Sequence, residues 1–147
     1  MNETIQMRTW AEVSLDNLAH NYRTLQALMP EGCRFLGVVK ANAYGHGAGA
    51  IGRKLQELGC GILAVACLDE AMELRRMQVT LPILCLGHTP PQLAPLLMEC
   101  GVTQTVADLK TGQALSAAAV AEGKTIPIHV KLDTGMSRLG FLWQEGC

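Results

Sequence analysis

The sequence has few charges of either sign and few aromatic residues. Only 17% of its 147 residues are charged and 4% are aromatic, and the formal net charge is −1. Without a basic stripe or an acidic tail, the composition argues against nucleic acid or an anionic membrane surface as a partner. The longest apolar run, ILAVACL, is only as long as a strand, so we expect no membrane-spanning segment.

Paired cysteines and metal-ligand spacings are also missing. The six cysteines form no CxxC pair, and the four histidines lie at no metal-ligand spacing from them. The polar first ten residues, MNETIQMRTW, lack the apolar stretch of a secretory signal. Disulfide frameworks belong mainly to small secreted chains. We therefore expect reduced thiols, no metal site and a cytoplasmic protein.

Apolar residues, in contrast, make up 49% of the sequence, enough for a sizeable core. Five short apolar runs are each typical of a strand, and the first four are followed by a helical pattern. Strands that are apolar on both faces and alternate with helices predict a parallel sheet, as an eight-stranded barrel or a doubly wound open sheet. No linker divides residues 1–147. The five predicted strands are 35–39, 62–66, 82–87, 103–107 and 126–133.

Four positions carry residues that favour the start of a helix. Ser14, Asp69 and Asp108 are predicted to cap helices with their side chains. Thr89 followed by Pro90 predicts a further helix start, because proline is favoured in the first turn. These helices, with one predicted over 46–58, would cover the sheet.

The stretch FLGVVKANAYGHGAGAIG ends an apolar strand with Lys40 and continues as a glycine-rich loop. GAGAIG (47–52) matches the dinucleotide fingerprint GxGxxG, with Asp69 near the expected acidic position, which makes an NAD-type oxidoreductase one alternative. Against it, six residues separate Lys40 from the first glycine of the fingerprint, which should follow the strand directly. The reading also leaves Lys40 without a role.

Lys40 itself supports another interpretation. A lysine at the end of a strand often only extends into solvent, but the carboxyl ends of parallel strands form the active face of α/β folds. An amine held there can condense with an aldehyde, as lysines do when they hold pyridoxal phosphate in a Schiff base. Lys131 occupies the matching place on the fifth strand, and Arg138 follows in KLDTGMSRLG. These three positively charged residues would lie at the carboxyl end of the sheet, with Asp133 and Asp69 as the nearby acids. The excess of positive charge predicts an anionic ligand.

Three segments then resemble one known family. VVKANAYGHG (38–47) closely resembles the pyridoxal-phosphate attachment motif of the bacterial alanine racemases, and HVKLDTGMSRLG (129–140) resembles the second block of that family. WAEVSLDNLAHNYRTL (10–25) is similar to its opening segment. The resemblance covers essentially the whole chain, but only the first half or less of a family member.

The resemblance implies a parallel (β/α)8 barrel of the TIM type, followed by a separate β-rich domain, in a homodimer that interconverts L- and D-alanine for peptidoglycan. Lys40 matches the lysine that carries pyridoxal 5'-phosphate and moves the α-proton on one face. Tyr44 matches the tyrosine that contacts the cofactor phosphate. Arg138 matches the arginine that reaches the cofactor and helps to hold the substrate carboxylate. Lys131 matches a lysine that is carbamylated in many members.

About five of the eight barrel units are then expected within 1–147, without the C-terminal β domain and the second catalytic base. We therefore expect this chain to be inactive alone. A serine racemase would share these motifs, and a pyridoxal-phosphate-binding carrier barrel without racemase activity is the non-enzymatic alternative.

Overall fold

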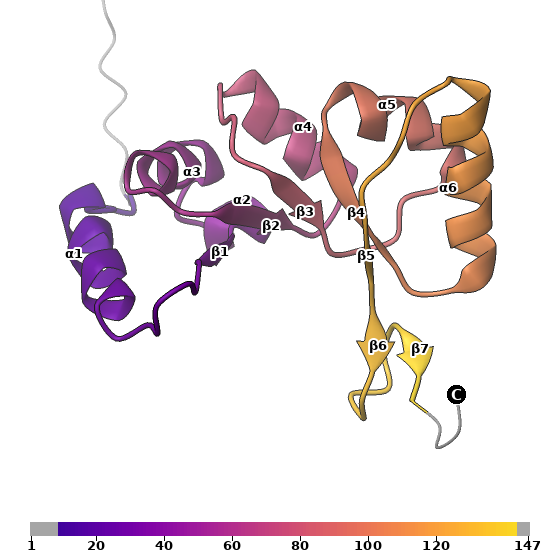
Figure 1. Ribbon diagram of the computed structural model, residues 1–147. Helices are drawn as coiled ribbons and strands as arrows, with labels where there is room; N and C mark the ends of the chain where they lie inside the picture. Colours follow the sequence, from indigo (N-terminus) through magenta and orange to yellow (C-terminus); the bar gives the residue numbers. More distant parts are fainter. Residues whose placement is uncertain (1–8, 144–147) are drawn as a thin grey trace, which may run out of the picture.

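The computed structural model describes residues 9–143, in which five parallel strands form one sheet (Figure 1). Each strand pairs with the next one along the chain, and one row of partners runs Val38, Ala64, Leu84 and Thr103 across the first four. The strands are β1 (Leu36–Val38), β2 (Ile62–Val65), β3 (Ile83–Cys85), β4 (Val102–Val106) and β5 (Ile128–Val130).

A small second sheet and the helices complete the fold. A second, two-stranded sheet follows β5 and is made of β6 (Leu132–Asp133) and β7 (Phe141–Leu142). In Figure 1 this small unit projects from the end of β5. The helices are α1 (Leu15–Gln26), α2 (Lys40–Tyr44), α3 (Ala48–Glu57), α4 (Leu68–Arg76), η1 (Pro91–Leu93), α5 (Ala94–Glu99) and α6 (Leu109–Ala121).

The strand order decides between the two predicted architectures. The strands follow one another in chain order, β1-β2-β3-β4-β5, without the reversal of a doubly wound sheet. Since connections between parallel strands are right-handed, a constant direction of travel puts every crossover helix on the same side. Helices α3 to α6 lie along one side of the sheet in Figure 1. The chain therefore has the fold of part of a (β/α) barrel, as predicted.

The core lies between the sheet and these helices. Leu63, Ile83 and Val102 on the strands are fully buried, as is Leu97 on α5. At the margin of this layer, the rings of Tyr22 on α1 and Phe35 lie 4.7 Å apart between centroids. Burial of large apolar side chains on the helix side of the sheet is the main stabilising contribution to such a layer.

Arg75 of α4 organises the amino-terminal end of the sheet. Its guanidinium donates to the carbonyl oxygens of Val79 and Leu81, each at 2.8 Å, and to that of Cys100 at 2.9 Å. Burial lowers the pKa of Arg75 from its usual value, while the nearby Cys100 has the opposite effect. Because these bonds satisfy carbonyls at the turns that lead into β3 and β4, this end of the sheet serves stability, and the opposite end is left for function.

The two outer strands are open edges in the described part of the chain. β1 and β5 each pair with a single strand of the sheet. Apolar side chains remain exposed on both, including Leu36 and Val38 at 40% and Val130 at 61%. Two open edges agree with the expectation that about five of the eight barrel units lie within 1–147.

The capping predictions are half right. Ser14 accepts a hydrogen bond from the N–H of Asn17, and Asp108 accepts one from Thr111. Asp69 is not a cap, because α4 begins two residues earlier than predicted and Asp69 lies in its first turn. Thr89 is no cap either, and its hydroxyl lies 3.7 Å from Sγ of Cys85 instead.

The fifth predicted strand, 126–133, is also shorter than expected. β5 ends at Val130, and the pairing restarts at Leu132 with a new partner, β7. Lys131 lies at the break, where its N–H still bonds the carbonyl of Val106 while its own carbonyl accepts from Phe141. The change of partner at Lys131 turns the chain out of the main sheet.

Candidate functional site

Lys40 follows β1 after a single residue, Val39, at the carboxyl end of the sheet. The preceding residue, Val39, is buried and its N–H bonds the carbonyl of Ala64 on β2. Lys40 itself is half-buried, and its amine makes no hydrogen bond or ion pair with any other residue of 9–143. The structure therefore holds the backbone at this lysine firmly and leaves its amine without a protein partner in the described region.

The segment after Lys40 has an uncommon backbone. Ala41, Asn42, Ala43 and Tyr44 all have φ between 50° and 55°, and the first three have ψ between 46° and 50°. These residues form a left-handed turn, which costs L-residues about 1 to 2 kcal/mol each. Such conformations persist only where the surroundings enforce them, and they gather at functional sites.

Hydrogen bonds within the segment enforce the turn. The N–H of Ala43 bonds the carbonyl of Val39 at 2.9 Å, and the N–H of Gly47 bonds that of Asn42 at 2.9 Å. The side-chain oxygen of Asn42 also accepts from the N–H of Ala48 at 2.7 Å, which ties the turn to the first residue of α3. The turn is thus continuous with α3 and is no loose loop.

Glu70 of α4 adds a bond from outside the segment. Its Oε1 accepts from the N–H of Ala41 and its Oε2 from the N–H of Ala66, both at 2.7 Å. Sequence analysis missed this residue, because it looked like an ordinary acidic residue of a helix. The available signal was an acid in the first turn of the helix after β2, at the same end of the sheet as Lys40.

The glycines after the turn allow α3 to pack closely against Met77 and Val79. Gly49 is buried inside α3, and a Cβ placed there would lie 1.9 Å from Sδ of Met77. A Cβ on Gly52 would lie 3.2 Å from the side chain of Val79. Gly49 is therefore used to bring α3 close to the end of α4, whereas the dinucleotide reading needs it open to a pyrophosphate. The geometry argues against that alternative.

Arg138 lies on the loop between β6 and β7, and its side chain is exposed. This loop turns around Asp133, whose Oδ1 accepts from the N–H of Gly135 at 3.0 Å and of Ser137 at 2.9 Å. These two bonds lower the pKa of the Asp133 carboxyl from its usual value. Asp133 therefore shapes the loop and forms no ion pair with Arg138 in the described chain.

A cavity of about 420 Å³ lies beside this loop, with Arg138, Asp133 and Asp108 among its lining residues. Hydrogen bonds from the backbone N–H and the hydroxyl of Thr111 lower the pKa of Asp108 from its usual value. Both acids are thus committed to local backbone structure. The guanidinium of Arg138 is the cation of this cavity.

The predicted site residues fall into two groups at one end of the sheet. Lys40 and Tyr44 belong to the turn after β1, and Tyr44 is 62% exposed. Lys131 and Arg138 follow β5, and Lys131 is half-buried. No hydrogen bond or ion pair joins the two groups within 9–143. They follow the two outer strands, β1 and β5, which the curvature of a barrel brings nearer to each other than a flat sheet would.

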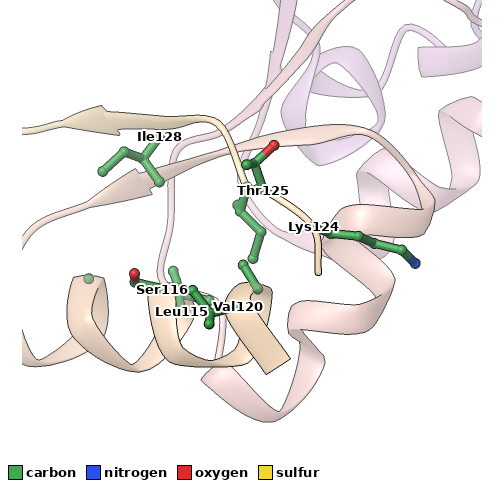
Figure 2. Close-up of a pocket in the computed structure, with 9 residues that line it drawn as sticks. Leu115, Ser116, Val120, Lys124, Thr125 and Ile128 are labelled. Carbon is green, nitrogen blue, oxygen red and sulfur yellow. The ribbon is translucent and has the colours of Figure 1, made fainter. Parts of the chain in front are cut away.

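Another pocket, of about 260 Å³, lies away from this end (Figure 2). It is formed by α6 and the chain that leads into β5, and its lining includes Leu115, Val120, Lys124 and Ile128. Because it opens at the amino end of β5 and is largely apolar, it belongs to the packing side of the fold.

Residues 9–143 contain neither a metal-binding cluster nor a membrane-spanning helix. No group of three or more His, Cys, Asp or Glu side chains there is arranged to hold a metal ion. No helix there is long and apolar enough to span a bilayer. Five cysteines of this part of the chain are free, and two of them, Cys60 and Cys85, are buried; Cys147 lies outside the described residues.

The fold and the site define an α/β protein of the TIM-barrel class with lysines and an arginine at the carboxyl ends of its outer strands. The family model described as alanine racemase, N-terminal domain, matches residues 13–146. The chain belongs to the alanine racemase family.

Individual relatives support this family assignment. An alanine racemase of Desulfovibrio desulfuricans is 46% identical over 136 residues, which cover 92% of this chain and 37% of the relative. An alanine racemase of Clostridium difficile 630, solved in complex with cycloserine, superposes with a TM-score of 0.92 at 41% identity, over 96% of this chain and 39% of that one. A histidine racemase from Leuconostoc mesenteroides matches with a TM-score of 0.79 at 28% identity, over 87% and 34%. The chain thus spans little more than a third of these relatives.

Proposed function

We propose that this chain is the cofactor-binding part of a pyridoxal-phosphate-dependent alanine racemase, with Lys40 as the lysine that carries the cofactor. The observation that carries the proposal is the position of Lys40, half-buried at the end of β1 and directly before a left-handed turn. The backbone there is fixed, and the amine has no protein partner in the described region. A nucleophilic amine needs both a defined position and a free reactive atom.

The residues at this end of the sheet fit the proposed cofactor. Pyridoxal phosphate offers an aldehyde and a phosphate, which an amine and positively charged or hydroxyl groups would bind. Lys40 supplies the amine, Tyr44 a hydroxyl and Arg138 a guanidinium. The acids Asp108 and Asp133 are already engaged with backbone N–H groups. The donor set therefore suits an anionic ligand.

The bound cofactor would supply an electron sink that makes the α-hydrogen of alanine acidic. In this proposal, the substrate amine replaces Nζ of Lys40 on the cofactor, and the freed Nζ then takes or returns that proton on one face of the substrate. Tyr44 binds the phosphate through its hydroxyl, and Arg138 binds the substrate carboxylate. Lys131 carries a carbamate, which would give Arg138 an anionic partner. The base for the other face lies outside this chain.

The proposal extends to the domain position of this chain and to the assembly and location of the whole protein. We place residues 1–147 in the N-terminal portion of the barrel domain, with a β-rich domain following in a polypeptide of family length. That protein would be a cytoplasmic homodimer that supplies D-alanine for peptidoglycan. We call such a polypeptide, containing this chain, the full-length racemase.

The proposal is tested by the substrate range of the full-length racemase. With added pyridoxal phosphate, we expect it to interconvert L- and D-alanine, with lower kcat/KM for serine and histidine. Chiral chromatography of the products measures all three. Histidine is included because one structural relative is a histidine racemase. Turnover of serine or histidine in preference to alanine would move the proposal to another racemase, and bound cofactor without any turnover would favour a carrier.

Replacement of Arg138 with lysine tests the proposed carboxylate contact. A guanidinium binds a carboxylate through two parallel hydrogen bonds, whereas an ammonium offers a point charge. We expect Arg138→Lys to lower kcat/KM for alanine by about tenfold or more, the value of one charged hydrogen bond. Steady-state kinetics of the full-length racemase measure the loss.

The matched control is Arg76→Lys, at the end of α4, where the arginine is exposed and makes no hydrogen bond to the described residues. This control should retain the original kinetics. Equal kinetics in the Arg138 and Arg76 variants would show that Arg138 does not contact the substrate.

A further inference from the structure

Glu70 joins the Lys40 segment to the next unit of the fold. Resting on the proposed role of Lys40, we propose that Glu70 is a positioning residue that fixes this lysine for cofactor attachment. One carboxylate oxygen of Glu70 accepts from the N–H of Ala41, and the other accepts from the N–H of Ala66. The first bond reaches back 29 residues along the chain to the peptide that follows Lys40.

The bond to Ala41 fixes a peptide plane. The N–H of Ala41 belongs to the same rigid peptide unit as the carbonyl of Lys40. Its direction sets the backbone on one side of Lys40, and the bond from the N–H of Ala43 to the carbonyl of Val39 sets the peptide on the other side. Since Ala41 is also the first left-handed residue of the turn, Glu70 holds the peptide where the chain changes from strand to turn.

Capping of α4 alone does not account for this arrangement. The bond from Ala66 is local, four residues from Glu70, and one oxygen is sufficient for it. The other oxygen stabilises a distant segment. An ionised carboxylate only accepts hydrogen bonds, so it suits two N–H groups at 2.7 Å, and such charge-assisted bonds are stronger than neutral ones.

Hydrogen bonds also connect Glu70 to residues at the carboxyl ends of β2, β3 and β4. Ala66, which donates to Glu70, accepts through its carbonyl from the N–H of Gly87 at 3.1 Å. The carbonyl of Gly87 accepts from the buried side-chain amide of Gln104 at 2.7 Å. A Cβ on Gly87 would lie 2.4 Å from the carbonyl oxygen of Ala66, so the approach requires glycine. These bonds connect the segments at the carboxyl ends of β1 to β4, and Glu70 links the turn after β1 to them.

The test compares Glu70→Gln and Glu70→Ala with Asp69→Asn in the full-length racemase. Glutamine preserves the shape of Glu70 but offers one acceptor oxygen, so one of the two N–H groups loses its partner. Asp69 is the matched control, because it is the neighbouring acid in the first turn of α4 and makes no hydrogen bond to the described residues. It therefore controls for loss of a charge near the start of the helix.

We expect Glu70→Gln to weaken the apparent affinity for pyridoxal phosphate by about tenfold, as for one charged hydrogen bond. Attachment to Lys40, trapped with borohydride at successive times, should slow, and the visible absorption of the bound cofactor should change. Glu70→Ala should lose more, and Asp69→Asn should match the original protein. Circular dichroism and thermal unfolding show whether each variant is folded.

The outcomes separate the two proposals. If the unmodified protein attaches cofactor at Lys40 and folded Glu70→Gln does so with the same affinity, rate and spectrum, the positioning role of Glu70 is wrong while the proposed function stands. A loss in the Glu70 variants that merely parallels their unfolding also overturns it. If the unmodified protein attaches no cofactor at Lys40, the proposed function fails and this inference fails with it.

Discussion

Replacement of Lys40 with alanine in the full-length racemase is expected to abolish covalent attachment of pyridoxal phosphate. Racemisation of alanine should fall by about 10²- to 10⁴-fold from the loss of a proton-transferring group alone, and further from the loss of the attachment point. Lys40 lies two residues after the last residue of β1, on a backbone held by the hydrogen bonds of Val39 and Ala41. Borohydride reduction followed by peptide mapping measures attachment, and chiral chromatography measures turnover.

Lys54→Ala is the matched control. Lys54 lies on α3, where its amine pairs with Oε2 of Glu57 at 3.1 Å, so its removal should leave attachment and turnover intact. In the unmodified protein, the adduct should be on the peptide that contains Lys40. An adduct on Lys131 or Lys54, or full attachment in Lys40→Ala, would contradict the assignment.

The second prediction with a large effect is that residues 1–147, expressed alone, are inactive. We expect residues 1–147 without further sequence to show no sustained interconversion of the alanine enantiomers. A closed barrel of this type takes about 250 residues, and β1 and β5 are open edges with exposed apolar side chains. Unpaired edges of this kind promote aggregation or pairing with another chain. Inversion also requires a base on each face of the substrate, and Lys40 can serve only one.

The measurement is to express residues 1–147, add pyridoxal phosphate, and follow optical rotation and α-deuterium incorporation from D- and L-alanine. Size-exclusion chromatography reports the expected self-association, and a sample of free cofactor gives the background rate. Deuterium exchange from one enantiomer alone would agree with a single base. Sustained racemisation above the background would overturn both the argument from the missing base and the expectation of an incomplete enzyme.

Much of the fold could be predicted because local signals and the strand pattern agree. The first four apolar runs each correspond to one strand and the fifth contains β5 and β6. The caps at Ser14 and Asp108 formed because each side chain can reach an N–H three residues ahead. Barrel and open sheet could not be distinguished from the pattern of strands and helices, since both contain the same units. Only the spatial order of the strands distinguishes them.

The turn after Lys40 could not be predicted. Ala41 and Ala43 favour right-handed helix in isolation, yet both have φ near 50°. Hydrogen bonds within the segment hold this conformation, together with the bond from Ala41 to Glu70, whose distance in sequence hides the relation. The same holds for Asp69, a plausible cap by type, which lost that role because α4 begins earlier and its neighbour Glu70 bonds the N–H of Ala66.

The hydrogen bond between Ala41 and Glu70 joins residues 29 positions apart, so it can form only late in synthesis of this region. The turn after Lys40 is unfavourable for its residues taken alone, and its outside support comes from a glutamate 29 residues later. Synthesis proceeds from the amino terminus, so Lys40 leaves the ribosome well before Glu70. Until β2 and α4 have been made and have docked, its segment lacks the hydrogen bond to Glu70. Maturation of the lysine's surroundings is thus coupled to completion of the following β–α unit, and a nascent chain that stops short of α4 would present a lysine without its fixed geometry.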